Sequence, residues 1–184
     1  MSEEFIVDNC SPTLAGIKTG NLFSVRITEE VDIYREIRQL NRKLRSRGIR
    51  VIPLKKTEEY ALIYLYRPKY LKKDLNDPEA LRILRKRGYH CDSPEHCIVQ
   101  LIGRLRDSKS FPHEIGLFLG YPPSDVACFI KHPCEGVKCC GCWKAFSKPD
   151  AARKTFSRFE MCTKAYRQMN RQGKSLTQLA VRTG

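Results

Sequence analysis

The sequence predicts an α+β fold, with a mixed or antiparallel sheet of about four strands and several flanking helices. Apolar residues recur at helical spacing in some segments and alternate with polar residues in others. These segments do not follow the strict alternation of a parallel α/β sheet. The chain has 184 residues, of which 41% are hydrophobic, and this suits one domain with a sizeable core. We expect a single domain over residues 1–174 and a frayed tail over 175–184.

The first half of the chain contains the clearest helix pattern. Residues 21–27 are predicted to form a strand, because apolar side chains alternate there. Residues 29–47 are predicted to form a helix that is capped by Thr28 and ended by Gly48. Its apolar stripe repeats at spacings of four, three and four residues and consists of Ile33, Ile37, Leu40 and Leu44.

Residues 49–56 and 59–66 are predicted to form an antiparallel hairpin, because two strand-like runs are joined by a short turn. Residues 61–65 are apolar on both faces, which indicates a central strand. The rest of the chain reads as mainly helical, with caps and Gly or Pro residues at the element ends. The predicted helices cover 78–87, 94–107, 112–119, 124–131 and 149–171, and a further strand covers 139–146.

The hydropathy pattern predicts a soluble cytoplasmic protein with no membrane partner. The longest apolar run, 61–66, is too short to cross a bilayer. The acidic start leads into no long apolar stretch, so we expect no secretory signal. The nine cysteines are then expected to be reduced thiols.

The net charge of +14 indicates an anionic partner. Three blocks, 35–56, 67–88 and 144–174, carry +8, +5 and +7. Such a basic field attracts phosphorylated metabolites, nucleic acid or an acidic protein. The same charges can also serve as solvated helix faces that keep a protein soluble.

Cys10 is the first candidate for chemistry. Ser11 followed by Pro12 is typical of a helix start, which would place Cys10 at a positive helix N-terminus that favours a thiolate. Lys18 would add positive charge to such a site. A capped helix with a buried cysteine explains the same residues.

Residues 111–122 contain a second candidate, His113 beside Glu114, in the first turn of a short apolar helix. A histidine with a carboxylate partner can act as a general base, although adjacent helical residues do not face each other. The alternative is a structural histidine, with Glu114 serving the helix dipole. Leu117 stands where the zinc motif HExxH requires its second histidine, which excludes that motif.

The third candidate is a cysteine-rich segment over 134–144. Cys139 and Cys142 have the CxxC spacing of a half-site, and Cys91 and Cys97 offer further ligands, so zinc or an iron–sulfur cluster is a candidate cofactor. A Cys-rich strand edge in a reducing compartment is the alternative. Arg67, which leaves a strand into a proline turn, can clamp an anion or lie over a surface tyrosine.

Three segments together resemble a known family. They are Cys10-Ser-Pro-Thr-Leu-Ala-Gly-Ile-Lys, His113-Glu-Ile-Gly-Leu-Phe-Leu-Gly-Tyr-Pro with Asp125-Val126, and Cys140-Gly-Cys-Trp-Lys. They resemble a bacterial family, seen chiefly in anaerobic, clostridia-like bacteria, that is catalogued only as a domain of unknown function. The family pattern has one Cys-Gly-x-Trp-Lys and no cysteine cluster. The resemblance therefore implies a stand-alone cytoplasmic protein and shifts weight from metal ligands toward Cys10, His113, Glu114, Cys140 and Lys144.

These observations lead to three hypotheses. The first is a small protein with one polar site that binds an anionic small molecule or performs thiol-dependent catalysis, with Cys10 as nucleophile, His113 as base and Glu114 as its partner. The anionic molecule would be held by Lys18, Arg67 and Lys144. The second hypothesis is a zinc or iron–sulfur module, and the third is a nucleic-acid-binding protein that uses basic helix faces without a recognisable motif. Whether the protein is an enzyme stays open at this point.

Overall fold

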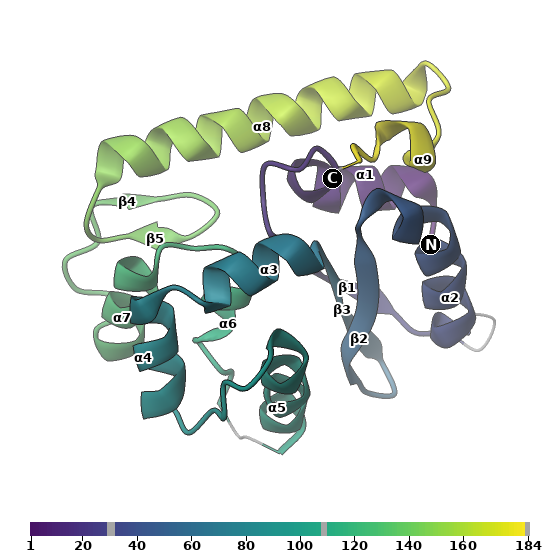
Figure 1. The fold of residues 1–184 in the computed structure, drawn as a ribbon. Helices are drawn as coiled ribbons and strands as arrows, with labels where there is room; N and C mark the ends of the chain where they lie inside the picture. Colours follow the sequence, from purple (N-terminus) through teal and green to yellow (C-terminus); the bar gives the residue numbers. More distant parts are fainter. Residues whose placement is uncertain (29–31, 108–109, 183–184) are drawn as a thin grey trace. The chain divides into compact units, whose positions relative to one another are not determined.

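The chain folds into two compact units. The residues that this computed structural model describes are 1–28, 32–107 and 110–182. Unit 1 comprises Met1–Lys69 and Met161–Gly184, and unit 2 comprises Tyr70–Glu160. Helices and antiparallel strands occur together (Figure 1), which confirms the predicted α+β class. None of the described helices is both long and apolar enough to cross a membrane.

Unit 1 is built on a three-stranded antiparallel sheet in the order β1-β3-β2. The strands are β1 (Gly20–Arg26), β2 (Arg50–Lys56) and β3 (Tyr60–Tyr66). The predicted hairpin and the central position of the second hairpin strand are confirmed. The register of β2 against β3 shifts between Pro53 and Lys55, and Pro53 is tolerated because β2 is an edge strand.

Helix α1 (Glu3–Leu14) begins eight residues before the helix start predicted at Ser11, and that prediction is wrong. The Ser2 side chain accepts a hydrogen bond from the Phe5 N–H at 3.2 Å and caps the helix. Glu3 and Glu4 then occupy the first turn, where the helix dipole favours negative charge. Cys10 consequently lies in the second half of the helix and not at its N-terminal end.

Helix α2 (Ile33–Leu44) confirms the predicted amphipathic helix, and it continues as the 3₁₀ turn η1 (Arg45–Arg47). Its cap is Asp32 and not Thr28, because the Asp32 carboxylate accepts hydrogen bonds from the N–H groups of Tyr34 and Arg35. The predicted first residues of this helix, 29–31, lie outside the described residues. Gly48 ends the segment as expected.

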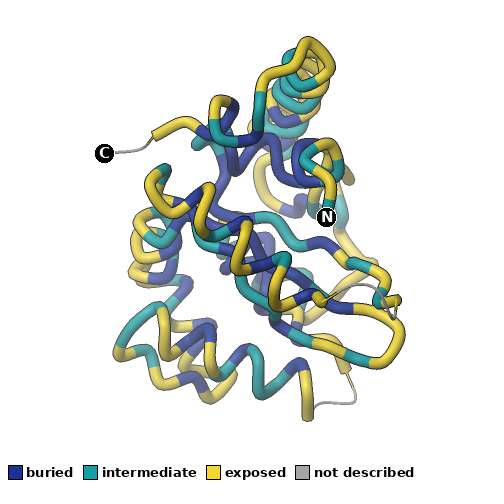
Figure 2. The backbone as a smooth tube through the Cα atoms, turned by 90° about the vertical axis from the view of Figure 1, so that its right-hand side faces the viewer, coloured by how far each residue is buried: buried dark blue, intermediate teal, exposed yellow. Residues whose placement is uncertain are grey.

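The core of unit 1 lies between the sheet and its helices. Helix α1 contacts β1, and α2 contacts β2. Figure 2 shows burial alternating with exposure along the helices, as expected where one side of each helix covers a core. The fully buried members of this core include Ile6, Val7, Cys10, Leu14, Leu44, Ile49, Val51, Ile63 and Leu65.

The C-terminal segment differs from the predicted frayed tail. Ser175 and Gln178 form a capping box at the start of α9 (Leu176–Leu179). Leu176 and Leu179 are buried in the core of unit 1, and α9 contacts α1. This packing keeps the segment ordered as far as the described residues extend. Helix α8 (Pro149–Arg171), which precedes it, confirms its predicted bounds and runs from unit 2 into unit 1.

Unit 2 is mainly helical, as predicted. Asp77 caps α4, and Ser93 accepts a hydrogen bond from the His96 N–H at the start of α5, so both predicted caps are confirmed. Helix α3 was not predicted, because the proline after Arg67 reads as a turn in the sequence and in fact occupies the first helical position. The helices are α3 (Pro68–Leu75), α4 (Pro78–Lys86), α5 (Pro94–Asp107), α6 (Ile115–Phe118) and α7 (Pro123–Lys131).

The predicted strand over 139–146 is corrected to a small hairpin. Two short strands, β4 (Cys139–Cys140) and β5 (Lys144–Ala145), pair antiparallel. The chain reverses at Gly141, Cys142 and Trp143, and the Gly141 N–H donates to the Trp143 carbonyl at 3.1 Å.

Candidate ligand-binding pocket

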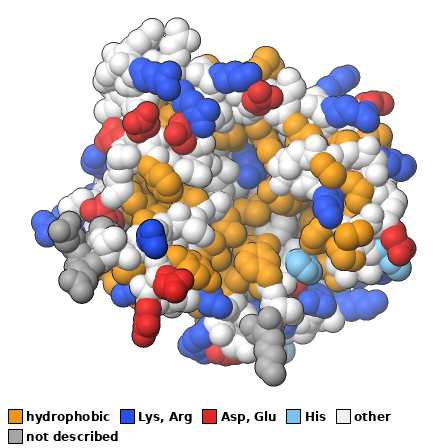
Figure 3. Space-filling model, turned by 180° about the vertical axis from the view of Figure 1, so that it is seen from behind, with side chains coloured by type: hydrophobic (Ala, Val, Ile, Leu, Met, Phe, Trp, Pro, Cys, Tyr) orange, Lys and Arg blue, Asp and Glu red, His pale blue; other side chains and the backbone are white. Residues whose placement is uncertain are grey.

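Unit 2 contains a pocket of about 410 Å³, a size that suits a small molecule. Its walls come from the segment leading into α6, from α7 and from the β4–β5 hairpin. Figure 3 shows hydrophobic side chains gathered on one face of the molecule, with lysine, arginine and histidine side chains among them. The rings that line the pocket belong to Phe111, His113, Tyr121, Phe129 and Trp143.

Close backbone packing brings α6 and α7 together beneath the pocket. A β-carbon on Gly116 would lie 2.9 Å from a methyl carbon of Val126 and 3.2 Å from the ring of Tyr121. Glycine therefore lets the α6 backbone approach α7 and the following tyrosine more closely than any other residue could. Gly116 and Val126 both line the pocket, so this contact sets the shape of its floor.

The β4–β5 turn is fixed against α8 within unit 2. A β-carbon on Gly141 would lie 2.3 Å from the ring of Phe156, which excludes larger residues at this position. Trp143 packs edge-on against Phe156 at a centroid distance of 4.5 Å and tilts over Tyr121 at 5.0 Å. Such aromatic pairs stabilise beyond the area that they bury, so they hold the indole in the pocket wall.

Asp125 anchors the same turn from α7. Its Oδ2 accepts a hydrogen bond from Trp143 Nε1 at 2.9 Å, and its Oδ1 accepts from the N–H groups of Phe146 and Ser147 and from the Ser147 hydroxyl. Burial would raise the pKa of Asp125, but these hydrogen bonds outweigh burial and lower it. The carboxylate is therefore ionised, and its hydrogen-bonding capacity is used within the protein.

Lys144 and His113 bring cationic and polar groups to the aromatic pocket. The Lys144 ammonium donates to the Pro133 carbonyl at 2.8 Å and lies 5.5 Å from the centre of the Phe129 ring. An ammonium has three donors, so this hydrogen bond leaves two for a ligand. His113 packs edge-on against the same Phe129 ring, with the ring centres 5.0 Å apart, and its side chain is exposed. The structure thus brings together two predicted site residues, His113 and Lys144.

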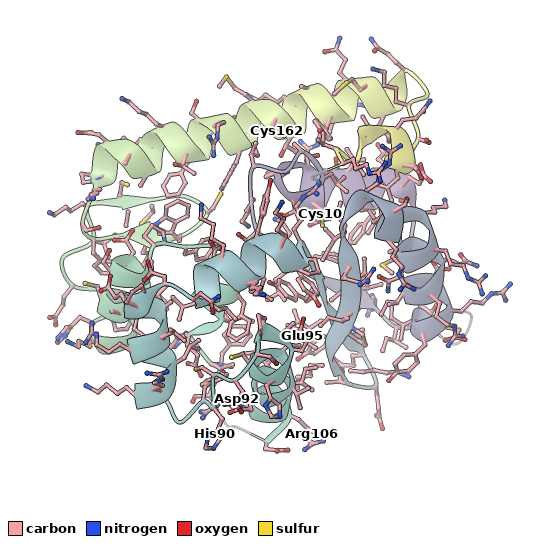
Figure 4. The ribbon with its side chains drawn as sticks, viewed as in Figure 1. Cys10, His90, Asp92, Glu95, Arg106 and Cys162 are labelled. Carbon is pink, nitrogen blue, oxygen red and sulfur yellow. The ribbon has the colours of Figure 1, made fainter. Side chains whose placement is uncertain are left out.

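Cys10 lies in the core of unit 1 and not in this pocket. Its side chain is completely buried among apolar residues, and Figure 4 shows it inside the unit. Burial raises the pKa of the Cys10 thiol more than the nearby Lys18 lowers it. A thiolate nucleophile is therefore disfavoured. The structural alternative, in which Cys10 is a small buried residue of a capped helix, fits the structure. Lys18 also belongs to unit 1, in the loop between α1 and β1.

Arg67 has a structural environment in place of the predicted anion site. Its side chain is completely buried, and its guanidinium donates to four main-chain carbonyls at 2.7–3.1 Å. Two of these carbonyls end α1, where the helix dipole favours a positive charge. The four acceptors are the carbonyls of Thr13, Leu14, Arg47 and Val181.

Glu114 is also held by protein partners. Its carboxylate is completely buried, accepts a hydrogen bond from the Tyr89 hydroxyl at 3.1 Å and lies 3.4 Å from Arg87 Nε. Arg104 lies 4.0 Å from the same carboxylate and 4.5 Å from the centre of the Tyr89 ring. Glu114 does not line the pocket, although the neighbouring His113 does. The predicted His113–Glu114 pair is thus divided between two environments.

The predicted metal ligands are not gathered into one group in the described part of the chain. Among the residues described, no group of three or more His, Cys, Asp or Glu side chains is placed to hold a metal ion. Burial, and next the neighbouring Cys91, raise the pKa of Cys97 to about 12, so this thiol does not favour the deprotonated form that binds metals. The Cys139 thiol contacts the Pro149 carbonyl at 3.7 Å, and only Cys142 lines the pocket.

Sequence reasoning missed the aromatic wall and its anchor. Tyr121, Phe129 and Trp143 come from three different segments, and no periodic pattern links them. The usable signal was the one tryptophan of the chain, which lies beside Lys144 in a Cys-Gly-Cys-Trp-Lys turn. Asp125 sits in the first turn of α7, where an acidic residue is expected from the helix dipole alone, so nothing marked it as an anchor.

The fold and the pocket define a small α+β protein with a preformed aromatic pocket that carries a cationic group. The chain belongs to the DUF3793 family of proteins of unknown function, whose family model matches residues 6–180. The resemblance to a family known only as a domain of unknown function is thereby confirmed. No curated protein and no solved structure matches the chain.

Proposed function

We propose that the pocket of unit 2 binds a small, planar, anionic molecule. The observation that carries this proposal is the placement of Lys144 within a pocket walled by aromatic rings. Aromatic faces such as those of Trp143 and Tyr121 favour a flat, apolar ligand body. The two remaining donors of the Lys144 ammonium favour a carboxylate, sulfonate or phosphate on that body.

The charge of the pocket argues against a cationic ligand. Asp125 is the only carboxylate among the lining residues described, and its oxygens already accept hydrogen bonds from Trp143, Phe146 and Ser147. A ligand ammonium would meet Lys144 without a free carboxylate to balance it. We therefore expect discrimination by the sign of the ligand charge.

The thiol-dependent alternative loses its nucleophile with the burial of Cys10. Cys142 lines the pocket, but among the described residues no hydrogen bond joins its thiol to His113 or Lys144, the two candidate bases in the same lining. Binding is therefore the role that the pocket supports best.

The test compares two aromatic probes of similar shape and opposite charge. We expect naphthoate to bind more tightly than naphthylmethylammonium in isothermal titration calorimetry. Lys144→Gln should weaken naphthoate binding by about tenfold, the lower end of what a charged hydrogen bond contributes, because Lys144 is half-buried. Lys131→Gln is the matched control, since Lys131 is exposed at the end of α7 and does not line the pocket.

The single tryptophan localises the probe. Energy transfer from Trp143 to anilinonaphthalene sulfonate should appear when this dye binds. Naphthoate should displace the dye and so reduce the energy-transfer signal. Equal affinities for the two naphthalene probes, or an unchanged naphthoate affinity in Lys144→Gln, would contradict the proposal. Native mass spectrometry of the purified protein would then show whether another small molecule or a metal is carried.

A further inference from the structure

The outer face of α2 in unit 1, continued by Arg45 at the start of η1, carries a row of arginines, which we call the arginine face: Arg35, Arg38, Arg42 and Arg45. All four are exposed, and they recur at spacings of three, four and three residues. At 100° per residue they cover less than a quarter of the helix circumference. The centre of this face lies nearly opposite the buried stripe of Ile33, Ile37, Leu40 and Leu44.

These arginines make few ion pairs with the described carboxylates of the protein. Arg38 lies 3.9 Å from Asp32 in a pair whose side chains are both more than half exposed, and such pairs are weak. The side chains of Arg35, Arg42 and Arg45 pair with no carboxylate among the described residues. Like charges three or four residues apart on a helix repel one another, which offsets the favourable interaction of Arg42 and Arg45 with the C-terminal end of the helix dipole.

Two acidic groups near this face are engaged elsewhere in the described part of the chain. Glu36 pairs with the amino group of Met1, and Glu3 pairs with Lys43 at 2.6 Å. Strand β2, which contacts α2, adds three further basic residues to the positive charge of this region: Arg50, Lys55 and Lys56. The segment 35–56 therefore keeps its net charge of +8 after folding and presents much of it to solvent.

We propose that the arginine face binds the phosphate backbone of nucleic acid. From Arg35 to Arg45 the helix rises about 15 Å, which corresponds to the rise of roughly four phosphates of one strand along the axis of a duplex. Guanidinium groups are suited to phosphate oxygens by charge and by their forked donors. Phosphate contacts carry no sequence information, so the binding is expected to be independent of sequence. This site lies in unit 1 and is independent of the pocket proposed in unit 2.

The experiment measures how affinity depends on salt. Fluorescence anisotropy with short labelled oligonucleotides, one single-stranded RNA and one duplex DNA, gives the dissociation constants of the full chain and of a variant with Arg35, Arg42 and Arg45 changed to Gln. Each phosphate contact contributes about 0.7 to 0.9 to the log–log salt slope. If three contacts are lost, the natural protein should lose roughly 20- to 40-fold more affinity than the variant between about 50 and 200 mM salt.

A control variant separates this face from general basicity. Arg82, Arg85 and Lys86 are exposed on α4 in unit 2. Changing these three residues to Gln removes as many positive charges as the α2 variant does. Glutamine is a good helix former, and circular dichroism should confirm that both variants are folded. The proposal predicts a reduced slope for the α2 variant alone. Equal slopes for the two variants, no binding at low salt, or binding to phosphatidylserine vesicles without binding to either oligonucleotide would overturn it.

Discussion

Substitution of Asp125 tests whether this carboxylate builds the pocket. In Asp125→Asn one carboxylate oxygen becomes an NH₂ group. If the amide oxygen faces Phe146 and Ser147, the NH₂ group faces the Trp143 N–H, and two donors then oppose each other. The indole N–H is left without its acceptor, and the remaining hydrogen bonds are made to a neutral amide oxygen instead of a charged carboxylate.

The magnitude follows from those contacts. A hydrogen bond to a charged group contributes about 1.5–3 kcal/mol, and the weakening of the other three adds to this loss. We therefore expect Asp125→Asn to lower the free energy of unfolding by about 2–4 kcal/mol. For a chain of this size that corresponds to a fall in melting temperature of roughly 5–15 °C.

The pH dependence gives the sign of the effect. The pKa of Asp125 is lowered in the folded protein, so its stabilising contribution is complete above the unfolded-state pKa of about 3.9 and is lost as the pH falls through the lower folded-state value. The stability difference between the natural protein and Asp125→Asn should hence be constant near neutral pH. It should begin to shrink below about pH 4, where the carboxylate of the unfolded chain becomes protonated, and it should be lost once the folded carboxylate is protonated at still lower pH.

The assay is thermal unfolding followed by the emission of Trp143, which is the only tryptophan and donates to Asp125. Asp150→Asn provides the control, because Asp150 makes an exposed ion pair with Arg153 and its loss should change stability by less than about 0.5 kcal/mol. Equal melting temperatures for Asp125→Asn and the natural protein at neutral pH would refute the anchoring role. A difference that persists undiminished at low pH would refute its dependence on the carboxylate charge.

Two further predictions concern unit 1 and the cysteines. Arg67→Lys should destabilise unit 1 by about 3 kcal/mol in urea unfolding, because one ammonium cannot reach the four separated carbonyls that the guanidinium contacts; an unchanged midpoint would contradict this. Iodoacetamide at neutral pH should modify the exposed Cys140 and Cys142 of the folded protein but not the buried Cys10 and Cys97, as read by peptide mass spectrometry. Rapid labelling of Cys10 without unfolding would show that it is accessible after all.

The parts of the fold that could be predicted are those with local patterns. The apolar stripe of α2 predicts this helix, and two apolar runs joined by a short turn predict the β2–β3 hairpin. Helix α1 was misplaced because Pro12 looks like a helix start, although the helix tolerates it in its last turn. The β4–β5 hairpin was read as one strand because its turn is fixed by Phe156 on α8, a contact that no local pattern reveals.

The candidate site could be predicted only in part, for a related reason. Residue types selected His113 and Lys144 as candidates, and both line the pocket of unit 2. The same reasoning also selected Cys10 and Arg67, which the structure buries in unit 1. Chemical capability is visible in a sequence, but the partners that use it up are not.

Arg67 and Lys144, two of the predicted anion-binding residues, differ in how many of their hydrogen-bond donors the protein already uses. Arg67 has its donors directed at four main-chain carbonyls and is fully buried, so a ligand could bind it only by displacing a protein partner, at a large cost in stability. Glu114 is also fully buried, beside two arginines, and although its Oε2 accepts no hydrogen bond among the described residues, it does not line the pocket. Lys144 donates one hydrogen bond of 2.8 Å to the Pro133 carbonyl, is half-buried and lines a pocket, so a ligand can add contacts there without removing any. By the same reasoning the arginine face of α2, whose guanidinium groups are exposed and largely uncommitted among the described residues, is the part of unit 1 best able to gain a partner.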